Sequence, residues 1–204
     1  MSEGAAGFRE AIEAFIRREA KPAEKFGHQP RLYALTAEIG EELDYDDDVV
    51  HAAAWLHDLG VFRGHRPEEI EQLSQWDNVA YAMQHAPRVL REAGFPEAKI
   101  GAVVEAIRTH QSHMEPTTIE GLILHDADIL EQLGAIGAMR TICKIGRDTR
   151  FVTFTDAAAS LKKALDTLPE KLRLERALLL AGPRIVALHL FLGALAGEAG
   201  AELF

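Results

Sequence analysis

The amino-acid sequence predicts an all-α fold, a helical bundle with additional helices at its C-terminal end. Apolar residues recur at intervals of three and four along most of the 204 residues, as on the buried faces of helices. Strand signals are almost absent, and Phe151–Phe154 is the only short run rich in β-branched and aromatic residues. Because no internal repeat or low-complexity linker is visible, we expect one domain over residues 1–204, with a core of about 22–150 and a helical extension at 151–204.

Four helices are predicted in the first half of the chain, over Ala5–Ala20, His28–Leu43, Asp47–Leu59 and within Ile70–Ala93. Each shows an apolar face of helical period. Asp46 is a typical N-cap for the third helix, and Gly60 fits its C′ position. Gly94 is expected to stop the fourth helix.

The second half of the chain predicts five more helices. Pro96 opens one that His110 ends, and the capping-box pattern Thr117–Glu120 opens the next, which runs through Leu133. Later boundary signals predict helices that begin at Asp156, at Pro169 and after a break at Gly182-Pro183.

The composition favours a soluble, folded chain that binds neither duplex nucleic acid nor membrane. The chain is 48% hydrophobic and 26% charged, and its net charge of −10 lacks the clustered Lys and Arg that nucleic acid requires. Cys143 is the only cysteine, which excludes an internal disulfide and is compatible with a reducing cytosol. No targeting segment is visible, and Ile185–Ala196 is too short to cross a bilayer. We therefore expect a cytoplasmic protein.

The pair His57-Asp58 ends a strongly apolar helix and is the first candidate for chemistry. A charge on a buried helix is costly unless it is paired or coordinated, and the C-terminal end of a helix favours a cation. An isolated pair of this kind would more often be an exposed Asp beside a core His. Here similar residues stand near the ends or on the faces of other helices, namely His28, His85, His110, Asp126 and Asp128. One inward-facing ligand from each of five helices would form a metal site in the bundle core.

In this order, the residues resemble the HD-domain superfamily of metal-dependent phosphohydrolases. Three stretches carry the resemblance: His28–Arg31, Ala53–Gly60, and His125–Asp128 with Leu133–Gly137. They span about residues 28 to 140, the middle half of the chain. The resemblance implies a single HD-type domain and an enzyme that hydrolyses a phosphomonoester or phosphodiester, including nucleotides, with a metal-activated water.

The resemblance also implies roles for individual residues. His28, His57, Asp58 and Asp128 would bind one ion, with His57 and Asp58 at the catalytic centre. Some branches add two histidines, and His85 and His110 stand where those fall, so we expect a dinuclear site bridged by Asp58. Asp126 would orient a histidine from outside the ligand set. The candidate substrate contacts are Arg31, His113 and Arg140.

Ligand type and departures from the family pattern leave several alternatives open. Imidazole nitrogen and carboxylate oxygen suit one or two ions of Fe, Mn, Co, Ni or Zn, and tolerate Mg. Ile129 stands where related small phosphohydrolases often have Arg, and the Gly-Tyr-Pro signature of the cyclic-dinucleotide branch is missing. The alternatives to a hydrolase are a di-iron oxygenase of the same superfamily and a non-catalytic nucleotide-binding module. The expected partners are a small phosphorylated substrate and, through the C-terminal helices, a second copy in a homodimer.

Overall fold

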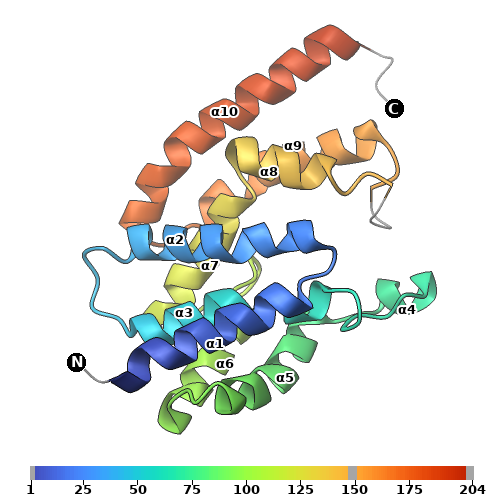
Figure 1. Cartoon of the computed structure of the whole chain (residues 1–204). Helices are drawn as coiled ribbons and strands as arrows, with labels where there is room; N and C mark the ends of the chain where they lie inside the picture. The colour runs from blue at the N-terminus through green and yellow to red at the C-terminus, as the bar shows by residue number, and fades with distance from the viewer. Residues whose placement is uncertain (1–2, 147–150, 201–204) are drawn as a thin grey trace. The chain divides into compact units, whose positions relative to one another are not determined.

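The computed structural model describes residues 3–146 and 151–200, and it confirms the all-α fold (Figure 1). In those ranges extended pairing is confined to isolated bridge positions, at Arg63 with Arg66 and at Phe151. The chain forms two compact units, Met1–His125 and Asp126–Phe204. The boundary between the units lies inside a helix. Phe151–Phe154, the only strand-like run in the sequence, leads into a helix.

The first unit contains six complete helices: α1 (Glu3–Glu19), α2 (His28–Ile39), α3 (Asp47–Leu56), α4 (Ile70–Ser74), α5 (Asn78–Glu92) and α6 (Ile100–Thr109). Short 3-10 turns join some of them: η1 (Ala23–Gly27), η2 (Leu59–Val61) and η3 (Glu97–Lys99). Helix α3 is central and packs against α1, α2 and α6. Every residue from Val49 to Leu56 is buried, and the small side chains of Ala52–Ala54 let these neighbours approach closely.

Charged side chains fix the N-terminal end of α3. Asp46 is its N-cap, as predicted, because the carboxylate accepts hydrogen bonds from the amides of Asp48 and Val49 at 3.1 and 3.4 Å. Lys99, before α6, pairs with Asp46 at 2.8 Å and with Asp48 at 3.1 Å. Arg9 of α1 also pairs with Asp48. Three helices are thereby joined at one point.

Replacing Asp48 with asparagine is expected to lower the free energy of unfolding by about 1 kcal/mol at pH 7. Partial burial raises the pKa of the Asp48 carboxyl, but hydrogen bonds from Arg9 and Lys99 outweigh burial, so its pKa lies below the ordinary value. The contribution is therefore fully present above the ordinary Asp pKa of about 3.9 and is lost as pH falls through the folded-state pKa. Urea unfolding of both proteins should give a constant difference from about pH 7 to 5 that shrinks in more acidic buffer.

Two boundaries in this unit differ from the prediction. Helix α3 ends at Leu56 rather than Leu59, and Gly60 lies in η2 without the positive φ of a C′ glycine. A Cβ on Gly60 would lie 2.5 Å from the carbonyl oxygen of Asn78, so glycine is required by the close approach of α5. The single helix predicted within Ile70–Ala93 is two helices, because Asp77 caps a new helix through the Ala80 amide.

Gly60→Ala is expected to destabilise the protein by about 2–3 kcal/mol, since the clash is with backbone and cannot be relieved by a side-chain rotation. Gly101→Ala is the matched control, because a Cβ there meets open space on the exposed face of α6. That control should be neutral or stabilising by up to about 1 kcal/mol. Equal midpoints for the two variants in thermal unfolding would contradict the predicted difference.

Helix α7 (Ile119–Glu131) crosses the boundary between the units. Its predicted capping box is wrong. The Thr118 hydroxyl, not that of Thr117, accepts the Gly121 amide at 3.1 Å. The Glu120 carboxylate accepts the Asp46 amide at 3.0 Å, a tertiary contact that local pattern does not reveal.

The second unit also contains α8 (Gly134–Ile142), α9 (Phe154–Thr167), η4 (Pro169–Lys171) and α10 (Glu175–Ala199). The N-cap of α9 is Thr153, and Asp156 is its reciprocal partner in a capping box rather than the cap itself. The predicted break at Gly182-Pro183 is wrong, because α10 continues through Pro183. Both residues are exposed, so solvent can satisfy the carbonyl that loses its helical donor. Among the described helices, α10 is the one with the length and mean hydropathy of a membrane span.

Candidate metal centre

The pair His57-Asp58 stands where α3 changes to a 3-10 turn. His57 is the helical C-cap, with φ −56° and ψ −34°, while Asp58 leaves the helix with φ −98° and ψ 15°. This change of backbone conformation lets both side chains reach the same space, although adjacent helical residues normally diverge. His57 is buried, and the Asp58 side chain keeps 22% of its surface exposed, so the group has access to solvent.

A hydrogen bond to the backbone fixes the ring orientation of His57. Its Nδ1 lies 2.9 Å from the carbonyl oxygen of Ala54, which can only accept, so Nδ1 carries a proton and the neutral ring has its lone pair on Nε2. His110, the C-cap of α6, repeats the arrangement with its Nδ1 2.6 Å from the carbonyl oxygen of Ile107. In both cases a helix end selects the tautomer that a metal ligand requires at Nε2.

Three side chains converge closely enough for one cation. Nε2 of His28, at the start of α2, lies 3.2 Å from Nε2 of His57 and 3.7 Å from Oδ2 of Asp58. Nε2 of His57 lies 3.6 Å from the same oxygen. Ligand atoms on one ion at about 2.0–2.2 Å are about 3.0–3.5 Å apart in tetrahedral or octahedral geometry. The donor set and its spacing therefore fit a divalent cation.

A third imidazole lies beside this group. The ring centroid of His110 is 5.0 Å from that of His57, and the ring of His28 is 5.2 Å from His57 on an edge-to-face contact. Of the two additional histidines that the sequence singled out, His110 is therefore next to the group of His28, His57 and Asp58. It can serve as a further ligand or as one for a second ion.

His85 and His113 are placed differently. The ring of His85 stacks on Tyr81 of α5, with centroids 4.0 Å apart, and it is outside the close group of three. His113 is exposed in the turn between α6 and α7. Their roles as ligand and substrate contact stay predictions.

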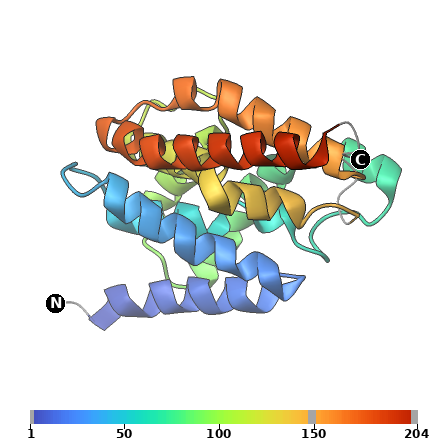
Figure 2. The same ribbon diagram turned by 90° about the horizontal axis from the view of Figure 1, so that it is seen from above.

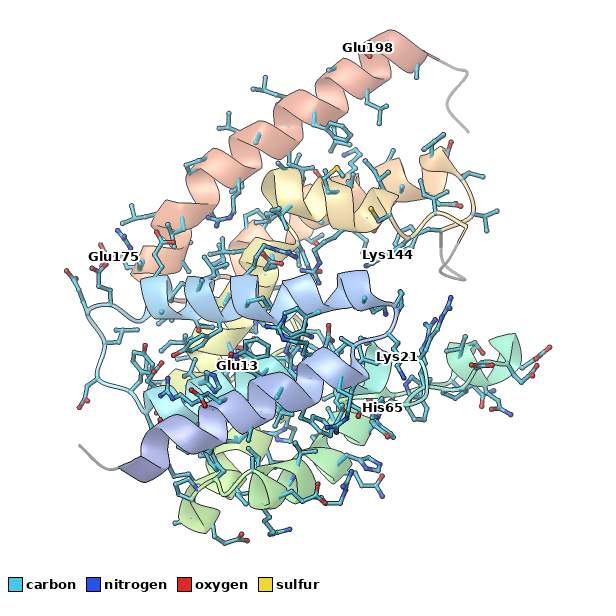
Figure 3. The ribbon with its side chains drawn as sticks, in the orientation of Figure 1. Glu13, Lys21, His65, Lys144, Glu175 and Glu198 are labelled. Carbon is cyan, nitrogen blue, oxygen red and sulfur yellow. The ribbon has the colours of Figure 1, made fainter. Side chains whose placement is uncertain are left out.

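The loop after Asp58 has a hydrogen-bonded network that the sequence did not reveal. His65, labelled in Figure 3, donates from Nε2 to the Glu19 carboxylate at 3.0 Å, and its Nδ1 accepts the Tyr81 hydroxyl at 2.9 Å. The first contact ties the loop to α1, and the second ties it to the helix that carries His85. Burial raises the pKa of the Glu19 carboxyl, whereas hydrogen bonds from Arg18 and His65 lower it by a larger amount. The pKa of Glu19 therefore lies below its ordinary value. The partners are far apart in sequence, so no local signal could have found them.

Asp126 and Asp128 lie in the second unit. Asp126 is fully buried, and its carboxylate accepts hydrogen bonds from the backbone amides of Arg173 and Leu174 at 2.7–3.2 Å, just before α10. This contact, which holds the backbone immediately before α10, was not predicted. The Asp128 side chain is partly exposed and accepts a hydrogen bond from Gln132 at 3.1 Å. The predicted roles of Asp128 as ligand and of Asp126 in orienting a histidine stay predictions.

The two candidate phosphate-binding arginines have different surroundings. Arg31 is exposed one turn after His28, and its guanidinium lies over Gly27. Arg140 donates to both the carboxylate and the carbonyl of Glu131 at 3.2 Å. Since Glu131 is buried, Arg140 compensates its charge and so has a structural role. Contact with substrate stays a prediction for both arginines.

The comparisons with known proteins show a family and a shared fold. The HD domain family model matches residues 26–133, just over half of the chain. The fold is similar to that of Bacillus subtilis YpgQ crystallised with ADP, at 21% identity and a TM-score of 0.75 over 97% of this chain and 98% of that one. It is also similar to a predicted HD superfamily hydrolase from an uncultured Thermotogales bacterium, at 24% identity and a TM-score of 0.62 over 93% and 91%. No curated protein sequence matches the chain.

Proposed function

Since the chain belongs to the HD-domain family, we propose that it is a metal-dependent phosphohydrolase. The observation that carries the proposal is the convergence of His28, His57 and Asp58, whose ligand atoms lie within 4.8 Å of one another. Asp128 is proposed as the fourth ligand. Two imidazoles and two carboxylates form a donor set whose two negative charges balance a divalent cation. This set suits Fe, Mn, Co, Ni or Zn and tolerates Mg.

A divalent cation held by these residues would supply Lewis acidity and lower the pKa of water at the site. The protein supplies orientation. The hydrogen bond from His57 Nδ1 to the Ala54 carbonyl fixes the ring, so that Nε2 is held toward His28 and Asp58. The partial exposure of Asp58 leaves one side of the group open to a substrate. His110 and His85 are proposed as ligands of a second ion, with Asp58 between the two.

The proposed substrate is a small phosphorylated molecule, with nucleotides as the first class to test. YpgQ, which shares the fold, was crystallised with ADP. The net charge of −10 favours a small substrate held by a local cation over a long polyanion. Arg31, His113 and Arg140 are the proposed contacts for the substrate. The proposed compartment of the protein is the cytoplasm.

The proposal is tested on protein purified without chelator. We expect elemental analysis to find one or two ions of a first-row transition metal per chain. Hydrolysis of generic phosphomonoesters, phosphodiesters and nucleotides should be abolished by EDTA and restored by one of the candidate ions. A metal-loaded protein that turns over none of these substrates would overturn the assignment, and tight binding of a nucleotide without conversion would favour a regulatory module.

The imidazole of His110 beside His57 favours one second candidate, a di-iron oxygenase of the same superfamily. Additional histidine ligands are what a second iron would need. Iron-dependent product formation that requires O2 would favour this candidate. Equal turnover under anaerobic conditions would exclude it and leave the hydrolase.

A further inference from the structure

Helix α10 is apolar on two opposite faces. Ala177, Ala181 and Leu188 are buried, and the helix packs on this side against α8 and α9 of the same unit (Figure 2). On the other side Leu179, Val186 and Leu190 expose 58–66% of their surface. A helix that is apolar all round is normally covered all round, so the exposed side indicates a binding surface.

Six of the exposed residues form one stripe, which we call the outer stripe: Leu179, Gly182, Val186, Leu190, Gly193 and Gly197. Successive members are three or four residues apart, so they share a face, and the buried residues lie about 180° away from it. A Cβ built on any of the three glycines meets nothing within 4 Å. The stripe therefore has prominent side chains at Leu179, Val186 and Leu190, and shallow positions at Gly182, Gly193 and Gly197.

We infer that the outer stripe packs against the same stripe of a second copy of this chain, with the two helices antiparallel. A two-fold axis between Val186 and Leu190 places Leu179 over the partner's Gly197 and Val186 opposite the partner's Leu190. Leu179 then meets a glycine, and Gly182 and Gly193 face the partner's Ala194 and the partner's Pro183, which permits close approach of the two backbones. The stripe is thus its own complement.

The distribution of charged residues along α10 supports a second copy of the chain as the molecule that covers the outer stripe. No Asp, Glu, Lys or Arg occurs from Ile185 to Gly197, so identical faces can meet without repulsion. The antiparallel arrangement also brings Glu198 of one copy, labelled at the end of α10 in Figure 3, toward the partner's Arg176. Glu175 stands beside Arg176 at that end, so the antiparallel arrangement is favoured by the register of the stripe rather than by net charge at its ends.

A membrane fits the same face less well. Ala177, Ala181 and Leu188 on the opposite face are buried, so this part of α10 packs on α8 and α9 and is not surrounded by lipid, while 11% of its most apolar window is buried. Helices that lie on membranes carry many Lys and Arg on their polar side, whereas α10 has no Lys and two Arg. The net charge of −10 also opposes binding to anionic lipid.

The size of the stripe sets the concentration range of the test. A helix of 25 residues is about 37 Å long, and a face about 10 Å wide presents on the order of 400 Å² per copy. The two copies together would bury about 800 Å², below the roughly 1,200 Å² of stable interfaces, so we expect a weak, transient dimer that dissociates at about 10 µM or above.

Sedimentation velocity of the full chain from about 1 to 100 µM should show a shift from the 22.5 kDa monomer to twice that mass. Leu190→Glu should raise the dissociation constant at least about 100-fold, because a carboxylate would be buried at the centre of the stripe. Val152→Glu is the matched control, since Val152 is 72% exposed and lies outside α10. Circular dichroism checks that both variants fold.

Cross-linking tests the register independently. In a Cys143→Ser background, Leu190→Cys should give a covalent dimer with a short bis-maleimide, and Val152→Cys should not. A wild-type protein that stays monomeric to about 100 µM overturns the inference. So does a dimer that Leu190→Glu leaves intact, or a monomer that instead sediments with phosphatidylcholine–phosphatidylglycerol vesicles.

Discussion

Asp58→Ala is expected to lower kcat/KM for metal-dependent hydrolysis by at least about 1,000-fold, equivalent to about 4 kcal/mol of transition-state stabilisation. Asp58 is the carboxylate of the group of three, and its Oδ2 lies 3.6–3.7 Å from the two imidazole nitrogens. Without it, His28 and His57 offer two neutral donors and no charge to hold a divalent cation. Metal content by elemental analysis should fall together with activity.

Two further variants test whether the loss of activity in Asp58→Ala is caused by the loss of its charge. Asp58→Asn keeps the shape of the side chain and removes its charge, and it should lose metal almost as fully as alanine. Asp44→Ala is the control for the same chemical change, because Asp44 is exposed in the loop before α3. Unchanged turnover in Asp58→Ala with full metal content would remove the hydrolase proposal.

The fold was largely predictable because its main signals are local. Asp46 as N-cap and Gly94 as helix stop depend on residues within one turn, and both predictions are confirmed. Gly60, Glu120 and Pro183 were misjudged for a different reason. Gly60 packs against α5, Glu120 bonds to an amide 74 residues away, and exposure makes Pro183 tolerable. Local propensity contains no information about such partners.

The site was predictable in residue type but not in its supporting contacts. The order of histidines and aspartates pointed to His28, His57 and Asp58, which the fold brings together. The carbonyls that select the tautomers of His57 and His110 belong to Ala54 and Ile107, and any residue type could supply them. Side-chain identity therefore cannot reveal this half of the site.

We expect the two carboxylates of the Asp126-Ala-Asp128 motif to have different roles, with Asp126 stabilising the fold and Asp128 binding the metal. Asp126→Ala leaves the amides of Arg173 and Leu174 without their buried acceptor, so we expect a loss of about 2–4 kcal/mol in stability. Asp128→Ala removes a partly exposed side chain whose described partner is Gln132 one turn away, so stability should change by less than about 1 kcal/mol. Metal affinity should nevertheless fall by at least about 100-fold in the Asp128 variant.

Urea unfolding in EDTA measures the first difference, and titration of the chelated protein with Mn²⁺ measures the second. Unfolding in EDTA removes the stabilisation that a bound ion would add, so the two effects are not confounded. If Asp126→Ala folded normally and lost the metal while Asp128→Ala kept it, the assignment of the two carboxylates would have to be exchanged. If both variants bound Mn²⁺ as tightly as wild type, the ion would be held by residues of the first unit alone, with His110 as the nearest candidate for the fourth ligand.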